Sequence, residues 1–162
     1  MTDALGSKAF LGYSESDVNT VHKDPTDYGD NTEITMKGDE EKIILQTLRP
    51  GVWQNASQQL PGMRMVSGGF KYPLHPSDHV VLLKHLLGQV NSAQQGGTAA
   101  YKHSIKGADT LPAKGLSFTK NLDQMASHMF GVYLKQCTLD FEIRQAVMAT
   151  MEAVGKDSII GT

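Results

Sequence analysis

Cysteine is nearly absent from this 162-residue chain, and Cys137 is the single one. A lone cysteine excludes an internal disulfide and cannot by itself form a thiolate metal site. The chain also has no run of about 18 consecutive apolar residues, and its first residues, MTDALGSKAF, have no apolar stretch of signal-peptide length. These absences predict a protein that folds in a reducing cytosol, does not span a membrane and is not exported by a signal peptide.

The sequence also lacks an excess of positive charge. It has 15 Lys and Arg against 17 Asp and Glu, which gives a formal net charge of -2 and a pI of about 6.3. A protein that grips nucleic acid normally presents a basic surface. Any DNA near this protein is therefore expected to be loosely held.

Catalytic signatures are missing too. The sequence has no G-x-S-x-G elbow, no phosphate-binding glycine loop followed by lysine and no dinucleotide-binding fingerprint. His75 and His79 have the spacing of a zinc pair on a helix, but Pro76 is expected to keep His75 outside the helix, which favours a solvated helix start. Cys137 falls on the apolar face of a predicted strand, where cysteine behaves as a small hydrophobe. We expect no enzyme, no cofactor and no metal.

Strand-like alternation is the strongest pattern that the sequence does contain. It appears in KIILQTLR and MRMVSGGFKY, and Gly68 and Gly69 in the second segment predict a bulge or a close approach by another backbone. Alternation in AVMATMEAVGKD predicts a long hairpin with the preceding segment, YLKQCTLDFEI. In that segment the residues that face one way are Tyr133, Cys137, Leu139, Phe141 and Ile143.

One helix is predicted, at about residues 77–88. Ser77 or Asp78 is placed to cap its start, and Gly88 is placed to end it in a left-handed conformation. Lys84 and His85 are left for solvent or a partner. The predicted apolar face follows spacings of three and four and is broadened by neighbouring residues. Its main positions are Val80, Leu83, Leu87 and Val90, and the broadening positions are Val81, Leu82 and Leu86.

The chain is expected to form one domain with an N-terminal extension. Residues 1–32 are polar and rich in turn formers, which predicts an extended arm whose apolar residues Phe10, Leu11 and Tyr13 dock on a sheet edge. Residues 33–162 are predicted to form a single β domain, with a turn at KGDEE. Residues 50–62 and 91–100 are predicted to be loops.

The predicted fold class is mainly β: a two-sheet β-sandwich or partial barrel with one packed α-helix. The polar face of the C-terminal hairpin carries Thr138, Asp140, Glu142 and Glu152. Three interpretations of this acidic row stay open: a solvated sheet face, the acid and base of a glycoside hydrolase, and a surface that repels an anionic polymer. The single tryptophan argues against a sugar-binding cleft.

Several phrases occur in an order that resembles one protein family. They are YSESDVNT, MVSGGFKYPLHPSDHVVLLKHLLG, YKHSI, LPAKGLSFTKNL and MFGVYLKQCTLDFEIRQAVMATMEAVGKD. Together they resemble the tail tube (major tail) proteins of long-tailed bacteriophages over most of the chain. Relatives often carry a glycine at the last hairpin turn, where this sequence has Arg144 and Gln145. The positions that match the family pattern are Pro73, Leu74, Pro76, Leu87, Gly88, Gly131, Leu139, Phe141, Val147 and the terminal GKD.

The resemblance implies a non-enzymatic virion protein that assembles in the host cytoplasm. Copies would stack as hexameric rings around a channel for DNA ejection, with tape measure protein and genomic DNA in the lumen and tail terminator and distal tail proteins at the ends. On this hypothesis the row of Thr138, Asp140, Glu142 and Glu152 lines the lumen. Contacts between subunits would come from the arm, the two loops and the helix, through Phe10, Leu11, Tyr13, Val52, Trp53, Leu60, Lys84 and His85.

Other interpretations keep a similar scaffold but change its use. A head–tail completion ring, a distal tail ring and a secretion-system tube subunit are alternatives of the same class. A monomeric carbohydrate-binding β-sandwich is an alternative of a different class. Self-assembly into filaments of indefinite length distinguishes a tube subunit from the ring proteins and from the carbohydrate-binding monomer.

Overall fold

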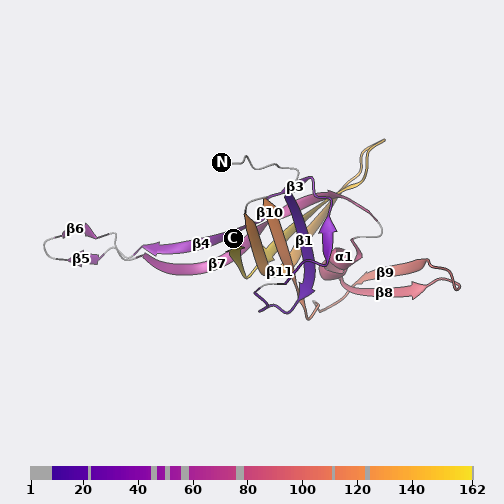
Figure 1. Ribbon diagram of the computed structural model, residues 1–162, viewed down its shortest axis with the longest axis horizontal. Coiled ribbons are helices and arrows are strands. Elements are labelled where there is room, and N and C mark those ends of the chain that lie inside the picture. The colour runs from indigo at the N-terminus through magenta and orange to yellow at the C-terminus, as the bar shows by residue number, and fades with distance from the viewer. Residues whose placement is uncertain are drawn as a thin grey trace.

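Two strands of 15 residues, β7 (Gln59–Pro73) and β11 (Ala126–Asp140), are the longest elements of the structure (Figure 1). The computed structural model describes residues 9–21, 23–44, 47–49, 52–55, 59–75, 79–110, 112–122 and 125–161. Strands dominate these residues, as the sequence predicted. The other elements, in chain order, are β1 (Ala9–Ser16), β2 (Asp27–Gly29), β3 (Glu33–Ile34), β4 (Lys37–Ile44), β5 (Thr47–Arg49), β6 (Val52–Asn55), α1 (Val80–Leu87), β8 (Gly88–Gln94), β9 (Tyr101–Gly107), β10 (Gly115–Leu122), β12 (Met148–Gly155) and β13 (Asp157–Gly161).

The main strands form two sheets that share β11. The first part of β11 pairs with β10 and β13, and β10 continues to β1 and β2. The second part of β11 pairs with β12, which continues to β7. β7 then pairs with both β3 and β4. Since the described strands do not close into a barrel, the predicted sandwich or partial barrel takes the form of two open, connected sheets.

β11 bends at Gly131, between the segment that pairs with β13 and the segment that pairs with β12. Gly131 has a φ of 62°, and a Cβ atom there would lie 2.9 Å from the Val18 carbonyl oxygen. The strands that pair with β11 are interrupted beside Gly131, because Lys156 separates β12 from β13. The Lys156 N–H donates to the Phe130 carbonyl at 3.2 Å. Glycine adopts this φ without the strain that a side chain would add.

The core lies between the two sheets. Phe118 on β10 contacts Tyr13 on β1 and Phe70 on β7, with ring centroids 6.0 and 5.4 Å apart. Because β7 and β10 belong to different sheets, the contact between Phe70 and Phe118 joins the layers. Full burial stabilises the fold by about 1.5–3 kcal/mol per large apolar side chain. The other buried apolar residues are Leu11, Met36, Val66, Tyr72, Leu82, Leu116, Met129, Val132, Leu134, Ala149, Met151 and Ala153.

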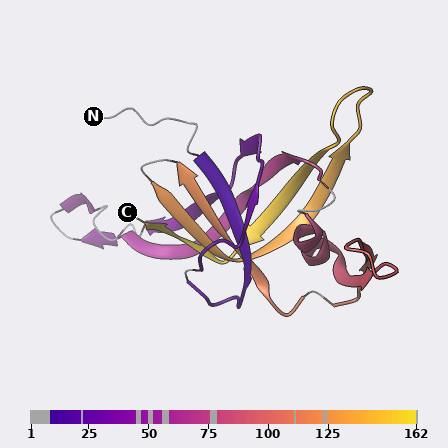
Figure 2. The ribbon, with the colours of Figure 1, turned by 45° about the vertical axis from the view of Figure 1, so that its right-hand side comes forward.

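The predicted helix is present, and it packs against β11 and the β8–β9 hairpin (Figure 2). It spans Val80–Leu87, while the proposed caps Ser77 and Asp78 lie outside the described residues. The predicted apolar face is correct in part: Leu82 is buried, and Val81, Leu83 and Leu86 pack against the core. Leu87 is 41% exposed, and His85, which was left for solvent, is buried. A helix of two turns can bury only a narrow stripe of side chains. The chain continues directly as strand β8 (Gly88–Gln94), so Val90 belongs to a strand and not to the helix.

The structure differs from the expected N-terminal arm. Ala9–Ser16 form β1, which pairs with β10 on one side and β2 on the other. Leu11 and Tyr13 are 1% and 2% exposed. Ser14 and Ser16 are buried as well, so apolar and polar residues are buried together and the strand shows no alternation. Residues 1–8 lie outside the described part of the chain.

Two expected loops and one expected turn are partly strands. KGDEE, predicted as a turn, lies within β4, and β4 and β7 form a long hairpin that projects from the body, with β5 and β6 beyond it (Figure 1). Part of the predicted loop 50–62 therefore belongs to β6 and β7. In the predicted loop 91–100, residues 91–94 belong to β8 and pair with β9. An exposed strand needs no buried face, so its sequence looks like that of a turn.

Candidate assembly interface

The outward face of the C-terminal hairpin carries the predicted acidic row. In the β11–β12 register Thr138 pairs with Thr150 and Gln136 with Glu152, so the predicted pairing of these two segments is correct. Thr138, Asp140 and Glu152 are exposed on this face. Glu142 lies beyond the end of β11, in the turn. The row is therefore three residues on strands with a fourth at the hairpin end.

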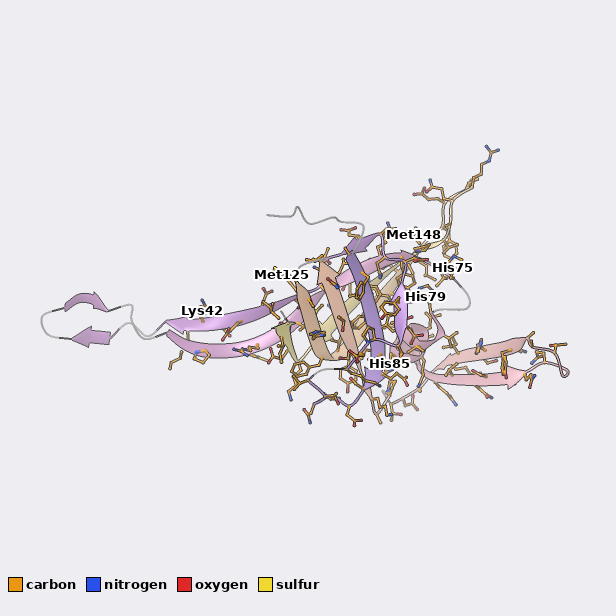
Figure 3. All side chains as sticks on the ribbon, in the orientation of Figure 1. Lys42, His75, His79, His85, Met125 and Met148 are labelled. Atoms are coloured by element: carbon orange, nitrogen blue, oxygen red, sulfur yellow. The ribbon has the colours of Figure 1, made fainter. Side chains whose placement is uncertain are left out.

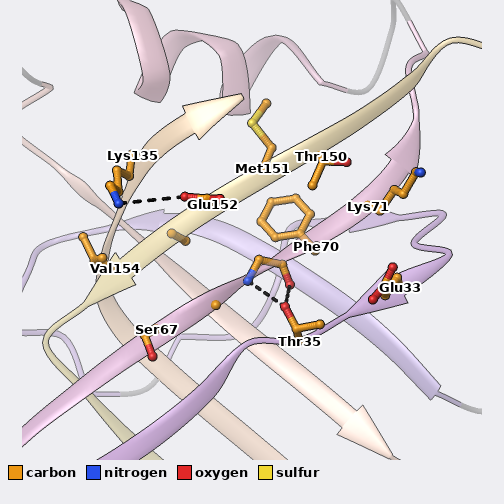
Figure 4. A pocket seen from close by; sticks show the side chains of 13 residues that line it. Glu33, Thr35, Ser67, Phe70, Lys71, Lys135, Thr150, Met151, Glu152 and Val154 are labelled. Atoms are coloured by element: carbon orange, nitrogen blue, oxygen red, sulfur yellow. Dashed lines mark hydrogen bonds and ion pairs between the residues drawn. The ribbon is translucent and has the colours of Figure 1, made fainter. Parts of the chain in front are cut away.

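Lysines make this face mixed in charge rather than purely acidic. The Lys71 ammonium lies 3.8 Å from the Asp140 carboxylate, and the Lys135 ammonium lies 3.9 Å from that of Glu152. All four side chains are at least 36% exposed. Exposed ion pairs of this kind stabilise a fold by about 0.2–1 kcal/mol each. Figure 4 shows Lys135 and Glu152 at one side of a groove that also includes Glu33 and Thr150.

The floor of this groove depends on the paired glycines. Gly68 has a φ of +126°, and a Cβ atom there would lie 2.6 Å from the Thr35 carbonyl oxygen. The Gly69 N–H donates to Thr35 Oγ1 at 3.0 Å, and the Thr35 hydroxyl donates to the Gly69 carbonyl at 3.1 Å (Figure 4). The Thr35 backbone N–H donates to the same carbonyl at 2.9 Å. The close backbone approach predicted at these glycines is therefore present.

The last hairpin turn contains a residue in the left-handed region. Arg144 has a φ of 66°, and it is the one non-glycine residue with a positive φ among the described residues. The family resemblance implies a glycine at this turn, and Arg144 takes the left-handed conformation there instead. The Gln145 N–H donates to the Glu142 carbonyl at 3.3 Å and closes the turn. The chain therefore accepts backbone strain of about 1–2 kcal/mol at this tip.

Several strands use one edge only. In the described residues β2 pairs with β1 alone, β4 with β7 alone and β13 with β11 alone. β13 approaches the β4–β7 hairpin: Arg64 Nη1 on β7 lies 3.8 Å from the Asp157 carboxylate, and a Cβ atom at Gly38 on β4 would lie 2.8 Å from Ser158 Cβ. No backbone ladder joins β13 to either strand in the described residues. Unpaired strand edges are templates for pairing with another chain unless they are covered.

Two of the predicted interface residues on β1 are in the core. Leu11 and Tyr13 are buried within the single chain, so their predicted role in contacts between subunits is wrong. A docked arm and a central strand both need apolar residues, and the sequence does not distinguish them. Phe10 is half-buried and contacts Tyr28 edge to face, with ring centroids 5.4 Å apart. Tyr28 is 61% exposed, so this pair lies at the surface.

Lys84 and His85 face Glu15 on β1 rather than a free surface. Lys84 Nζ donates to Glu15 Oε1 at 2.6 Å, and His85 Nε2 lies 2.9 Å from the same oxygen. The hydrogen bond from Lys84 is the main cause that lowers the pKa of Glu15, while burial lowers the pKa of His85. The His85 side chain is 0% exposed, so it makes no contact with another subunit. The prediction for His85 is wrong.

Apolar side chains of the projecting β4–β7 hairpin are exposed. Leu60 is 49% exposed, and Ile43 on the facing strand and Met63 further along β7 are 47% and 72% exposed. Figure 3 marks this hairpin by Lys42. Val52 and Trp53 belong to β6, and their side chains lie outside the described part of the structure.

Sequence reasoning missed an exposed apolar tip. Phe141 and Ile143 were assigned to the same face as Cys137, but β11 ends at Asp140 and they are 73% and 93% exposed in the turn. The sequence feature that could have revealed this tip is FEI, two apolar residues directly before the predicted turn. Apolar residues that stay exposed in a turn point to a contact outside the chain.

His79 and Cys137, which the sequence raised as candidates for a metal ligand and a nucleophile, pack against neighbouring residues. His79 stacks on Tyr72 with ring centroids 4.0 Å apart, and its Nδ1 lies 3.0 Å from the His75 carbonyl oxygen. Burial raises the pKa of the half-buried Cys137 thiol. Within the described ranges, no three His, Cys, Asp or Glu side chains gather as a metal site would require. The described part of the chain also contains no helix long and apolar enough to cross a membrane.

Comparison with known proteins gives similarity in structure alone. No protein-family model and no curated protein matches the chain. A chain from the tail of an empty GTA particle, refined with C6 symmetry, matches with a TM-score of 0.56, 9% identity and coverage of 97% of this chain and 96% of that one. A chain from the sheath-tube complex of an extracellular contractile injection system (PVC) matches with a TM-score of 0.58 and 9% identity. That match covers 99% of this chain and 93% of the other.

The SPP1 tail tube is a third similar structure, with a TM-score of 0.52, 11% identity and coverage of 98% of this chain and 79% of that one. All three belong to tail or tube assemblies, and each match extends over nearly the whole of this chain. They confirm the resemblance at the level of the fold. The chain has the fold of tail tube proteins.

Proposed function

We propose that this chain is a tail tube subunit whose copies join edge to edge into rings, and that the rings stack around a channel for DNA ejection. The observation that carries the proposal is the tail tube fold combined with sheet edges that the described chain leaves unpaired at β2, β4 and β13. A heterologous contact that closes makes a ring, and ring closure pairs such edges productively. Six subunits per ring is the number favoured by the C6 symmetry of the similar GTA tail.

The outward face of β11, β12 and β7 is the proposed lumen wall. Thr138, Asp140 and Glu152 lie on it, with Glu142 at its rim. Carboxylates paired with lysines leave little net positive charge on this face, so DNA phosphates would find no strong grip there. The expected occupants of the lumen are tape measure protein and then genomic DNA.

Stacking is proposed to use the projecting elements. The β4–β7 hairpin carries exposed Ile43, Leu60 and Met63 and extends well beyond the sheets (Figure 1). The β8–β9 hairpin, which includes part of the 91–100 segment, projects on another side. Tail terminator and distal tail proteins would occupy the two ends, and the assembled particle would be a virion tail built in the host cytoplasm.

Negative-stain microscopy of concentrated purified protein tests the proposal. A tube subunit should form rings and tubes of indefinite length, and amide exchange at β2 and β13 should slow as tubes form. A chain that remains monomeric at high concentration, with these amides already protected, is not a tube subunit.

A ring at one end of a tail is a second candidate. A PVC sheath/tube terminator has the same fold, with a TM-score of 0.56 and coverage of 100% of this chain and 99% of that one. A terminator should form single rings or stacked pairs. Tube length therefore separates the two candidates.

A further inference from the structure

The exposed tip of the β11–β12 hairpin and a groove elsewhere on the sheets have complementary chemistry. We propose that the tip of one subunit binds the groove of a second copy in the next ring of the stack. This inference rests on the proposed tube function and names one contact that would hold successive rings together.

The tip consists of Phe141, Glu142 and Ile143. Phe141 is 73% exposed and Ile143 is 93% exposed, the largest exposures among the exposed large apolar residues of the described chain. Their neighbour Arg144 holds a strained left-handed backbone conformation that shapes the turn. Burying such side chains against another apolar surface is favourable because it removes them from water. The tip thus presents two apolar side chains with one carboxylate between them.

The groove is lined by the end of β10, the start of β11, β4 and β13. Leu122, Met125 and Ile160 line it and are 49%, 57% and 67% exposed, and the buried Met36 also contributes to it. Lys37 and Lys120 belong to the same lining. The groove thus presents apolar side chains with two ammonium groups beside them, the counterpart of the tip.

Lys37 is exposed and Lys120 is half-buried, and each already has one partner within the chain. Lys120 Nζ donates to the Met36 carbonyl at 3.4 Å, and Lys37 Nζ lies 3.0 Å from the Asp39 carboxylate in a pair that is 68% and 56% exposed. Glu142 of the tip has the charge that these lysines complement. Complementary charges of this kind fix orientation and exclude wrong partners more than they add affinity.

The tip and the groove lie at opposite ends of β11. Met125 directly precedes Ala126, the first residue of β11, and Phe141 directly follows Asp140, the last. Figure 3 labels Met125 on one side of the sheets and Met148, at the base of the hairpin, on the other. The groove lies beside the start of β11 and the tip lies beyond its end, which places them to join copies that follow one another along the strand direction. A tip-to-groove contact is heterologous and repeats without limit.

A disulfide between tip and groove tests this contact. In a Cys137→Ala background, Ile143→Cys combined with Met125→Cys should give a ladder of covalent multimers beyond the dimer on mild oxidation of tubes. Each single-cysteine variant serves as the control and should stop at the dimer. Tubes that form normally but give no ladder in the double variant overturn the inference and leave the proposed function intact. A chain that forms no tubes in any variant overturns both.

Charge reversal gives an independent readout. Glu142→Lys should lower the fraction of subunits in tubes about tenfold or more, and adding Lys37→Glu with Lys120→Glu should restore most of it. Asp109→Lys makes the same charge change in the exposed connection after β9 and should leave the tube fraction unchanged. Equal effects of Glu142→Lys and Asp109→Lys, without rescue, contradict the proposed contact.

Discussion

His85 Nε2 lies 2.9 Å from Glu15 Oε1, and this contact fastens α1 to β1 across 70 residues of sequence. Lys84 donates to the same carboxylate oxygen at 2.6 Å. Glu15 is one-third exposed, whereas the His85 side chain is fully buried. One carboxylate on β1 therefore bonds both Lys84 and His85 of the only helix in the described chain.

Replacing Glu15 by Gln should destabilise the fold by about 1–2 kcal/mol, because the bonds to Lys84 and His85 lose their ionic character and Glu15 is partly solvated. Urea unfolding of the monomer measures the change. Glu41→Gln, at an exposed position on β4, is the matched control and should change stability by less than about 0.5 kcal/mol. If the two variants lose the same stability, the bonds from Glu15 to Lys84 and His85 do not stabilise the fold.

Stability should fall as the pH is lowered, first because of His85. Burial lowers the pKa of His85 from its ordinary value of 6.5, so the unfolded chain binds a proton that the folded chain does not, and stability is lost as the pH falls below about 6.5. The lowered pKa of Glu15 has the same sign and acts below its ordinary value of 4.5. His85→Gln keeps a donor near Glu15 without titrating, so its unfolding free energy should change less with pH just below 6.5. An unchanged pH profile would contradict this assignment.

Gly68→Ala should destabilise the fold by about 2–4 kcal/mol, because the added Cβ meets the Thr35 carbonyl at 2.6 Å and the φ of +126° strains any side chain. Thermal unfolding measures the loss. Gly97→Ala has a φ of +73° but nothing within 4 Å, so it should show the backbone penalty alone, about 1–2 kcal/mol. Gly107→Ala has neither feature and should be close to neutral. A Gly68 variant no worse than the Gly97 variant would exclude the close approach.

Phe118→Ala should cost about 3–5 kcal/mol, because the ring is 0% exposed and contacts Phe70 of the other sheet. Phe141→Ala removes the same atoms from a side chain that is 73% exposed and should change monomer stability by less than about 0.5 kcal/mol. Denaturant midpoints at a fixed low protein concentration compare the pair. A large loss from Phe141→Ala would mean that the tip packs within its own chain.

Asp140→Lys combined with Glu152→Lys should leave rings and tubes intact but slow DNA release, since the exposed side chains are far from the core and the new charges attract phosphate. Release from particles assembled with the variant, followed by dye binding to free DNA, measures the rate. Its salt dependence should also increase. Unchanged release kinetics would place this face away from the lumen.

The C-terminal hairpin was predictable because each of its strands has one buried and one exposed face. Alternation in YLKQCTLDFEI and AVMATMEAVGKD indicated both strands, and the observed pairing of Thr138 with Thr150 follows from it. The long apolar run VVLLKHLL likewise indicated a helix, and the helix is there. Local periodicity therefore gave the elements in which a face is clearly buried.

The elements that were missed depend on partners distant in sequence. β1 pairs with β10, about 100 residues away, and its buried Ser14 and Ser16 hide the strand from any hydrophobic pattern. β4 is acidic and exposed because it forms half of a projecting hairpin. The pairing of Lys84 and His85 with Glu15 depends on the same tertiary arrangement, so no local pattern in the helix could reveal it.

Because β11 belongs to both sheets, a load applied to either one passes through a single continuous length of polypeptide to the other. The two layers cannot separate unless this strand loses its partners on one side of Gly131. We therefore expect a subunit under mechanical tension to yield in one all-or-none rupture rather than sheet by sheet. Such cooperative resistance is what the proposed tube would require of each subunit as its contents pass.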